Sequence, residues 1–485
     1  MTTTNLNPFT SATAMLQMLR ELRLSSVELL EMHLQRIQRL NPAINAIVIP
    51  DYENAREAAV KADEYRSKGD WSPLLGLPLT IKDCIDVQGL RGTAGVEAFA
   101  ERVPDADAQI TARARQAGAV IMGKTNVPPM AADLQANNPI FGRTNNPWNL
   151  ERTSGGSTGG GAAALAAGLT PLEFGSDIGG SIRIPAAFCG VYGHKPSETA
   201  IPRSGHFPGN PLPSPGALMG VQGPLARTAQ DLMLAFSVVS GPDVGEDAAW
   251  RLDSPAPRHE SLADFRVAVL PRIPWLPVDS EILAAQENLV VELKNVGATV
   301  EEAQPELFAD MRAHHELYSS LLTVLTSVGR PAEARQRLAD GMRNSSDMFG
   351  DAGARGLEAS ASDLLVWLGQ REKFRQSYRD FFRSWDVLLA PITIVPAFPH
   401  TDLPWPQRTV DVDGQAENYG LQTVYPAVAT LCGQPATAFP AGLTRSGLPI
   451  GLQAIGPYLE DRTSIQFTSL LEREFGGFQS PPGYD

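Results

Sequence analysis

The first seventy residues alternate between helical and extended patterns of hydrophobic positions. The stretch SSVELLEMHLQRIQRLNP repeats apolar residues on one face, as an amphipathic helix does. Ser25 and Glu28 have the spacing of a capping box at its start, and we expect Pro42 just past its end. INAIVIP then has the pattern of a strand, and NAREAAVKADEYRSKG predicts a second helix that ends at Gly69. The apolar positions of the first helix are Leu30, Leu34 and Ile37.

The same alternation continues into the next segment. LLGLPLTIKDCIDV is typical of a buried strand that runs into a turn. DAQITARARQAGAVIMGKTN predicts a helix, a stop at Gly118 and another strand. Helices that alternate with strands favour an α/β fold, with a central sheet covered by helices on both faces.

The second half of the chain changes character twice. Residues 242–262 are polar and rich in proline, which indicates a linker or surface excursion, and residues 279–385 are mostly helical in pattern. Strand patterns return in DVLLAPITIVPAFP and in PATAFPAGL and GLPIGLQAIGP. These late strands either complete the earlier sheet or form a second domain. Because the chain has no internal repeat and no flexible linker, one large domain is favoured.

Composition narrows the class of protein. The 485 residues are 43% hydrophobic and 19% charged, as in ordinary globular proteins. The net charge of −14 argues against nucleic acid or an anionic membrane as a partner, since both attract basic surfaces. No apolar run approaches the ~20 residues of a membrane span, and the N-terminus lacks the order of a signal peptide.

The cysteines and histidines point to a cytoplasmic protein without metal. Cys84, Cys189 and Cys432 are odd in number and far apart, which suits a reducing compartment. No Cys/His cluster has metal-ligand spacing, and we expect the pair His314 and His315 on a solvated helix face.

Residues 153–161, TSGGSTGGG, allow several interpretations. A phosphate loop needs a lysine after Gly161, and none is there. A dinucleotide fingerprint and a nucleophile turn of the G-x-S-x-G type both fit the letters, but each must follow a strand, and NNPWNLERTS does not have that pattern. The remaining interpretation is a glycine-rich turn that feeds a small-residue helix. The fingerprint would use Gly159, Gly161 and Ala164, and the nucleophile turn would use Ser157 with Asp386 and His400.

Two neighbouring motifs give this stretch its context. Downstream, PLEFGSDIGGSIRIPAAFCG begins like a strand and carries Ser181 behind two glycines. Upstream, Lys82 closes the apolar strand LPLTI. Burial lowers the pKa of a lysine, so such an amine can act as a base near neutral pH, although a surface charge is the simpler interpretation of Lys82 alone.

Together these motifs resemble the amidase signature family of Ser–Ser–Lys amide hydrolases. The resemblance rests on TSGGSTGGGAAALAAGLTPLEFGSDIGGSIRIPAAFCGVYGHKPS, GLPLTIKDCIDV, GKTNVPP, FGRTNNPWN and GQPATAFPAGLTRSGLPIGLQAIGP, and so covers nearly the whole chain. It implies one domain over residues 1–485 around a mixed β-sheet. Its expected parts are N-terminal helices (about 10–70), a signature core (about 71–240), a variable helical region (about 275–385), and C-terminal strands and a helix (about 386–485).

The resemblance also implies the catalytic residues. Ser181 matches the family's nucleophile, Ser157 its bridging serine, and Lys82 its base; the two serines are 24 positions apart, as in the family. The peptide before the bridging serine is cis in such enzymes, so Gly156–Ser157 is predicted to be cis. No cofactor is implied.

The segment DIGGS is expected to stabilise the oxyanion of the reaction. Its backbone N–H groups at Ile178, Gly179 and Gly180, followed by that of Ser181, can converge because the two glycines permit a tight turn. We expect the flanking Asp177 and Arg183 to brace this loop by hydrogen bonds, with two surface charges as the alternative.

The sequence departs from the family pattern in a few places. Thr158 and Gly161 replace commoner residues without touching the relay, and Pro129 suggests a different shape for the segment Met130–Asn138. Cys84 is interpreted as a small buried side chain rather than a second nucleophile.

The substrate is narrowed only to a small-molecule amide, or a related ester or carbamate. We expect an apolar pocket built partly from Met130–Asn138 and from helices in residues 300–350. The amidase subunit of a tRNA-dependent amidotransferase is the alternative, although that branch usually has Gln where Ile184 stands. A non-catalytic or nucleotide-binding protein remains a third hypothesis, and a homodimer is compatible with the family.

Overall fold

The computed structural model describes residues 7–208 and 218–484, which share one eleven-stranded mixed sheet. Strand β2 is parallel to both of its neighbours, β3 and β8, whereas β8–β10 and β16–β17 are antiparallel. In spatial order the strands are β1 (Ile47–Pro50), β3 (Val120–Thr125), β2 (Pro78–Lys82), β8 (Leu172–Asp177), β10 (Val221–Ala226), β9 (Tyr192–Lys195), β16 (Ala436–Leu443), β17 (Pro449–Ile455), β13 (Val387–Pro391), β11 (Arg266–Val269) and β12 (Thr299–Glu302).

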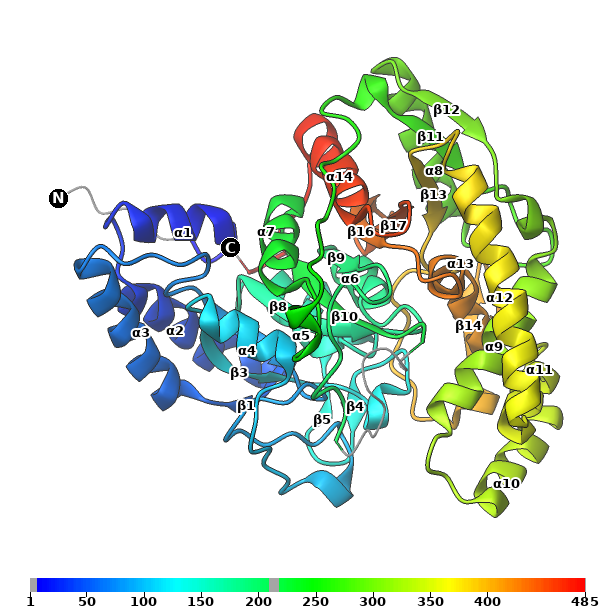
Figure 1. The fold of residues 1–485 in the computed structure, drawn as a ribbon, viewed down its shortest axis with the longest axis horizontal. Helices are drawn as coiled ribbons and strands as arrows, with labels where there is room; N and C mark the ends of the chain where they lie inside the picture. Colours follow the sequence, from blue (N-terminus) through cyan, green and yellow to red (C-terminus); the bar gives the residue numbers. More distant parts are fainter. Residues whose placement is uncertain (1–6, 209–217, 485) are drawn as a thin grey trace.

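Helices cover both faces of this sheet, as predicted (Figure 1). In chain order they are α1 (Ala12–Arg20), α2 (Ser26–Ile44), α3 (Tyr52–Ser67), α4 (Gln109–Gln116), α5 (Gly159–Ala166), α6 (Arg183–Cys189), α7 (Ala229–Val239), α8 (Ser280–Asn295), α9 (Met311–Thr326), α10 (Ala332–Arg343), α11 (Gly350–Glu358), α12 (Ala361–Phe381), α13 (Val424–Thr430) and α14 (Asp461–Phe475). Three hairpins lie outside the sheet: β4 (Asn137–Asn138) with β5 (Gly142–Arg143), β6 (Asn145–Asn146) with β7 (Asn149–Thr153), and β14 (Thr409–Val412) with β15 (Gln415–Asn418).

Two large apolar cores form among the described residues, one on each face of the sheet, and a small third cluster lies between α10 and α11. Helices α5, α6, α9 and α13 contribute to the first core, and α1, α4, α7 and α14 contribute to the second. Successive side chains of a strand point to opposite faces, and Leu79, Ile81 and Phe174 belong to the second core. The alternate positions Thr80, Lys82 and Glu173 therefore face the first core, on the side of α5 and α6.

The start of the chain follows the predicted pattern except at one proline. Ser25 and Glu28 form the capping box of α2, and α3 ends at Ser67 just before Gly69, which has φ 84°. Pro42, however, lies inside α2, which continues to Ile44. A proline in the last turn removes only one helical hydrogen bond, so the helix runs on until Asn45 turns into the left-handed region at φ 55°.

The late strands complete the earlier sheet rather than a second domain. β16 pairs with β9, and β17 lies between β16 and β13. Residues 242–262 are an irregular connection between α7 and β11, with a short 3-10 turn at Glu246–Ala248. The mostly helical pattern of residues 279–385 is confirmed by α8 to α12, whose later members form a layer far from α1–α3 (Figure 1).

Candidate active site

Lys82 ends the buried strand β2, as the sequence predicted, and its amine lies among hydroxyl groups. Lys82 Nζ is 2.7 Å from Ser157 Oγ, 3.0 Å from Ser176 Oγ and 3.4 Å from the Ser176 carbonyl oxygen. The side chain has no exposed surface. Burial lowers the pKa of Lys82, because an ammonium loses its hydration there. The amine is therefore suited to accept a proton near neutral pH.

The glycine-rich segment joins a hairpin to helix α5. Strand β7 ends at Thr153, so the expectation that no strand precedes this segment is wrong. β7 lies outside the central sheet, where it pairs with β6 and forms one isolated bridge from Arg152 to Pro399. Its first residues are exposed, so its polar sequence NLERT lacks the pattern of a strand in the central sheet. The Gly156–Ser157 peptide is cis, as predicted. This segment places the buried hydroxyl of Ser157 beside Lys82.

Ser181 follows a loop that begins where β8 ends at Asp177. Ser181 is 7% exposed, against 1% for Ser157. The Ser181 carbonyl accepts a hydrogen bond of 3.1 Å from the Thr158 N–H, which ties the two serine segments together. Among the described residues, the Ser181 hydroxyl makes no hydrogen bond. The structure thus joins Lys82 to Ser157 directly and brings Ser181 alongside through the backbone.

A buried ion pair braces the Ser181 loop, as predicted for Asp177 and Arg183. Arg183 Nη2 and Nε lie 2.9 and 3.0 Å from the two Asp177 oxygens. The same carboxylate accepts hydrogen bonds from the Gly180 and Ile182 N–H groups at 2.9 and 3.1 Å. Burial alone would raise the pKa of Asp177, but the charge and hydrogen bonds of Arg183 lower it to about 2. Asp177 is therefore ionised at neutral pH and holds the loop from inside.

The backbone donors of the loop are not equivalent. Gly180 has φ 97°, and a Cβ there would lie 2.8 Å from atoms of Ile184 and Pro426, so this turn requires glycine. The Gly180 N–H is already bound to Asp177. Within the described residues the Ile178 and Gly179 N–H groups have no acceptor. The Ser181 N–H has no acceptor there either, so three of the four N–H groups predicted to stabilise an oxyanion are free of other hydrogen bonds.

Tyr318, which the sequence did not single out, also holds this loop. Its hydroxyl donates to the Ile178 carbonyl oxygen at 3.0 Å, and the ring comes from α9 in the variable helical region. Tyr318 is 1% exposed. It follows HHEL on an amphipathic helix, where its pattern matches that of any core aromatic residue, so no sequence signal marks its contact.

The expectation of a solvated face at His314 and His315 is wrong. Both side chains are buried on α9, among Phe308, Phe349 and Phe374. Neither ring nitrogen of His314 has a hydrogen-bond partner among the described residues. Burial lowers the pKa of each histidine to about 3, so both are neutral. The helix is covered on this face by α12 and neighbouring aromatic residues, which local sequence does not reveal.

Cys84 carries a buried thiol next to Ser176, one of the hydrogen-bond partners of Lys82. Its Sγ is 3.6 Å from His206 Nε2 and 3.9 Å from Ser176 Oγ. Burial raises the pKa of Cys84 and lowers that of His206 well below its usual range. Both groups are therefore uncharged near neutral pH, in agreement with the interpretation of Cys84 as a small buried side chain.

The alternative interpretations of the glycine-rich segment find no matching geometry. Asp386 is bound by Arg258, His259 and Arg266, and its hydrogen bonds do not involve His400. All eight residues of α5 are buried, including the three small residues of the dinucleotide fingerprint. The helix is thus packed inside the first core.

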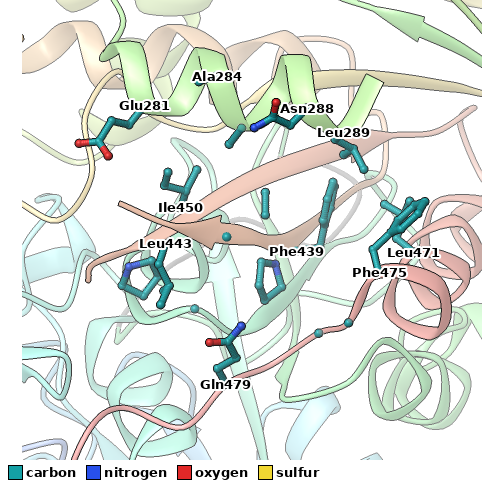
Figure 2. Close-up of a pocket in the computed structure, with 18 of the residues that line it drawn as sticks. Glu281, Ala284, Asn288, Leu289, Phe439, Leu443, Ile450, Leu471, Phe475 and Gln479 are labelled. Atoms are coloured by element: carbon teal, nitrogen blue, oxygen red, sulfur yellow. The ribbon is translucent and has the colours of Figure 1, made fainter. Parts of the chain in front are cut away.

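A groove of about 750 Å³ lies elsewhere on the molecule, between α8, the β16–β17 hairpin and the end of α14. Figure 2 shows Asn288 and Leu289 on α8 above the strands, with Phe475 on α14 at one end. None of Lys82, Ser157 and Ser181 lines this groove. It is therefore separate from the candidate site.

The described residues hold neither a metal cluster nor a membrane-spanning helix. In residues 7–208 and 218–484, no three His, Cys, Asp or Glu side chains are arranged to hold a metal ion. Over the same ranges, every helix is too short or too polar to cross a bilayer.

Comparison with known proteins extends over nearly the whole chain. A family model described as Amidase matches residues 28–465. The chain is 34% identical to the A subunit of the glutamyl-tRNA(Gln) amidotransferase of Roseiflexus sp. (strain RS-1), with 93% of each chain covered. It is 29% identical to the fatty-acid amide hydrolase 2-A of Danio rerio, over 98% of this chain and 91% of that one. The solved structure of 6-aminohexanoate cyclic dimer hydrolase with substrate has a TM-score of 0.77 and 27% identity, covering 99% of this chain and 98% of that one.

Proposed function

Because the chain belongs to the amidase signature family, we propose that it hydrolyses a small-molecule amide through a covalent intermediate on Ser181. Lys82 and Ser157 carry the proton in this reaction. Linear carboxamides are the main substrate class, with esters and carbamates as chemically related acyl donors. The protein acts on these substrates without a cofactor.

The proton path runs through Ser157 in both directions. Neutral Lys82 accepts the Ser157 hydroxyl proton, and Ser157 takes the proton of Ser181 as the Ser181 oxygen attacks the carbonyl carbon. When the C–N bond breaks, the same path returns the proton to the leaving nitrogen. Water then attacks the acyl-enzyme and releases the acid. A hydroxyl suits the middle position because it donates and accepts at once.

The backbone of the Ser181 loop stabilises the oxyanion. Ile178 and Gly179 provide N–H donors fixed in direction by the ion pair beneath them and by Tyr318. Donors held in place before the reaction need no reorganisation in the transition state, and one such donor contributes roughly 3 kcal/mol. Gly180, which was also predicted, would take part only by leaving Asp177.

The observation that carries the proposal is the 2.7 Å contact between Lys82 Nζ and Ser157 Oγ in a fully buried setting. A lysine without exposed surface and without a carboxylate in hydrogen-bond contact is expensive to keep charged. Two hydroxyls as its side-chain partners leave the amine free to act as a base.

The test combines turnover with covalent trapping. The purified chain alone is incubated with anilides, primary amides, esters and carbamates, and separately with a fluorophosphonate. We expect hydrolysis of at least one class and a phosphonate adduct on the peptide that contains Ser181. An adduct confined to another residue would contradict the assignment of the nucleophile.

A second candidate function is the amidase component of an amidotransferase. The 34% identity to an amidotransferase polypeptide over 93% of both chains favours it. Such a component would depend on partner subunits for its reaction. Hydrolysis by the isolated chain, at a rate that added partner subunits do not change, argues against this function; activity only in their presence supports it.

A further inference from the structure

A buried carboxyl group, that of Glu173, lies on the strand next to the one that carries the candidate base Lys82. Glu173 is the second residue of β8, and its Cα pairs with that of Thr80 on β2, two residues before Lys82. Thr80, Lys82 and Glu173 point to the same face of the sheet. Glu173 has no exposed surface. An ionised glutamate in this setting costs free energy unless another group stabilises its charge, and a protonated glutamate avoids that cost.

Helix α5 leaves space for this side chain at one position. A Cβ on Gly161 would lie 2.5 Å from Glu173 Cγ and 2.6 Å from its Cδ and Oε1. The last glycine of TSGGSTGGG is thus required by the close approach of Glu173. Serine or alanine, the commoner residues at this point of the motif, would displace the carboxyl.

The carboxyl is only half satisfied. Thr125 Oγ1 donates to Glu173 Oε1 at 2.6 Å, and Thr125 is the residue whose Cα pairs with that of Lys82 across β2 and β3. Glu173 Oε2 has no hydrogen-bond partner among the described residues. Burial raises the pKa of Glu173 to about 7, against the opposing effects of Thr125, Thr80 and Lys82. The group therefore changes charge in the pH range in which a lysine base works.

The other ionisable groups around Lys82 are either paired with an opposite charge or uncharged, so they do little to stabilise a Lys82 ammonium. Asp177 is neutralised by Arg183, and Asp83 by Lys124 at 3.2 Å. Cys84 and His206 are uncharged near neutral pH, since burial shifts both pKa values toward the neutral forms.

We propose that Glu173 is a positioning residue for Lys82. The charge of the Glu173 carboxyl sets how strongly the Lys82 amine holds the proton that it accepts from Ser157. The inference rests on the proposed role of Lys82 as the base. Loss of a proton from Glu173 creates a carboxylate that stabilises the Lys82 ammonium after it has taken the proton of Ser157. A protonated Glu173 favours the neutral amine. The two groups therefore titrate as a coupled pair.

The test is the pH dependence of Ser181 acylation in Glu173→Gln, which removes the charge and keeps the shape. Without the carboxylate the pKa of Lys82 falls, so the amine stays neutral to lower pH. We expect the acid limb of kcat/KM, and of fluorophosphonate labelling, to move down by about half a pH unit to one unit. KM is expected to change little.

Glu472→Gln is the matched control. Glu472 lies on α14, away from the site, burial raises its pKa to about 7 as well, and its Oε2 accepts a hydrogen bond from Ala229. We expect no displacement of the acid limb in this variant. An unshifted limb in Glu173→Gln, or an equal shift in the control, would overturn the role of Glu173.

A second variant covers failure of Glu173→Gln to fold. In Gly161→Ala/Glu173→Ala, the added methyl group takes part of the space that the glutamate leaves, and the same downward shift is expected. The double variant with an unshifted acid limb also overturns the proposal. Absence of any acid limb in the unsubstituted protein contradicts Lys82 as the base, and so distinguishes failure of the proposed function from failure of this inference.

Discussion

The signature core and the variable helical region bury their helices very differently. Every residue of α5 is buried, as is every residue of β2, β3 and β8. In the helical region, α10 buries Ala339 alone of its twelve residues. The 21-residue α12 buries only four, which are Arg371, Phe374, Tyr378 and Phe381.

This difference in burial corresponds to two structural roles. The core encloses charged and hydroxyl groups so completely that their pKa values and directions are fixed by the fold. The helical region covers the same face from outside and reaches the site through single side chains such as Tyr318. We therefore expect sequence change on the exposed faces of α10 and α12 to leave the proposed proton relay intact, and change in α5 or β8 to disturb it.

The largest contrast is expected from one substitution made in both regions. Ser181→Ala should lower kcat/KM by roughly 10⁴-fold or more, because the proposed nucleophile is lost. Ser320→Ala, at a buried serine of α9 whose hydroxyl donates to Ala352, should change it less than about tenfold. Steady-state kinetics and thermal unfolding of both variants make the comparison. Full turnover by Ser181→Ala would show that the nucleophile is misassigned.

The second largest contrast is expected between a buried ion pair of the core and an exposed ion pair of the helical region, in the free energy of unfolding that each contributes. Asp177→Ala leaves the buried Arg183 charge without its carboxylate and should lower the free energy of unfolding by about 3–5 kcal/mol. Glu287→Ala removes the partner of Arg272 from an ion pair that joins α8 to the segment after β11, with both side chains about two-thirds exposed. This loss should cost less than about 1 kcal/mol. Denaturant unfolding measures both values. Equal losses would mean that the Asp177 pair is far more hydrated than its burial implies.

His314, one of the two buried histidines of α9, gives the helical region its own pH dependence. The pKa of His314 is about 3 in the folded protein and near 6.5 when unfolded, so below pH 6.5 only the unfolded chain takes up this proton. Stability from this group is complete above pH 6.5 and falls by about 2 kcal/mol on acidification to pH 5. We expect His314→Phe to lose that decrease, as measured by unfolding at pH 5.0 and 7.5. An unchanged slope would contradict neutral burial of the ring.

The smallest expected effect comes from breaking the hydrogen bond between Tyr318 of the helical region and Ile178 of the core. Tyr318→Phe removes the hydrogen bond to the Ile178 carbonyl oxygen and should lower kcat about fivefold, equivalent to about 1 kcal/mol. Tyr378→Phe loses a matching 3.0 Å bond to the Val428 carbonyl oxygen on α13. It should reduce stability similarly and change kcat less. The same change in kcat for both variants would assign Tyr318 a packing role only.

Local patterns predicted the elements that hold the proposed catalytic residues. Lys82 at the end of an apolar strand and Ser181 after a strand-like start both lie where the sequence indicated. The capping box of α2 and the mostly helical pattern of residues 279–385 depend on neighbours along the chain, and both are confirmed. Asp177 and Arg183 are only six positions apart, so their contact was also within reach of the sequence.

What sequence could not supply depends on distant partners. His314 and His315 look polar in sequence, and only the aromatic residues of α12 and the loops around it make their face a buried one. The contact of Tyr318 with Ile178 joins residues 140 positions apart. Glu173 offered a faint signal, since a charged residue inside an apolar strand coincided with the unusual Gly161, but the meaning of that pair required their approach in space.

The junction of β9 with β16 has a consequence for biosynthesis. Lys195 and Ala436, which pair there, are about 240 positions apart, and β9 lies near the middle of the sheet. At ribosomal speeds of ~5–20 residues per second, the edge of β9 waits roughly 10–50 s for its partner. During that interval the nascent N-terminal half presents an unpaired strand at the edge of a half-built sheet, which is the state most prone to self-association and the one a ribosome-bound chaperone would have to cover.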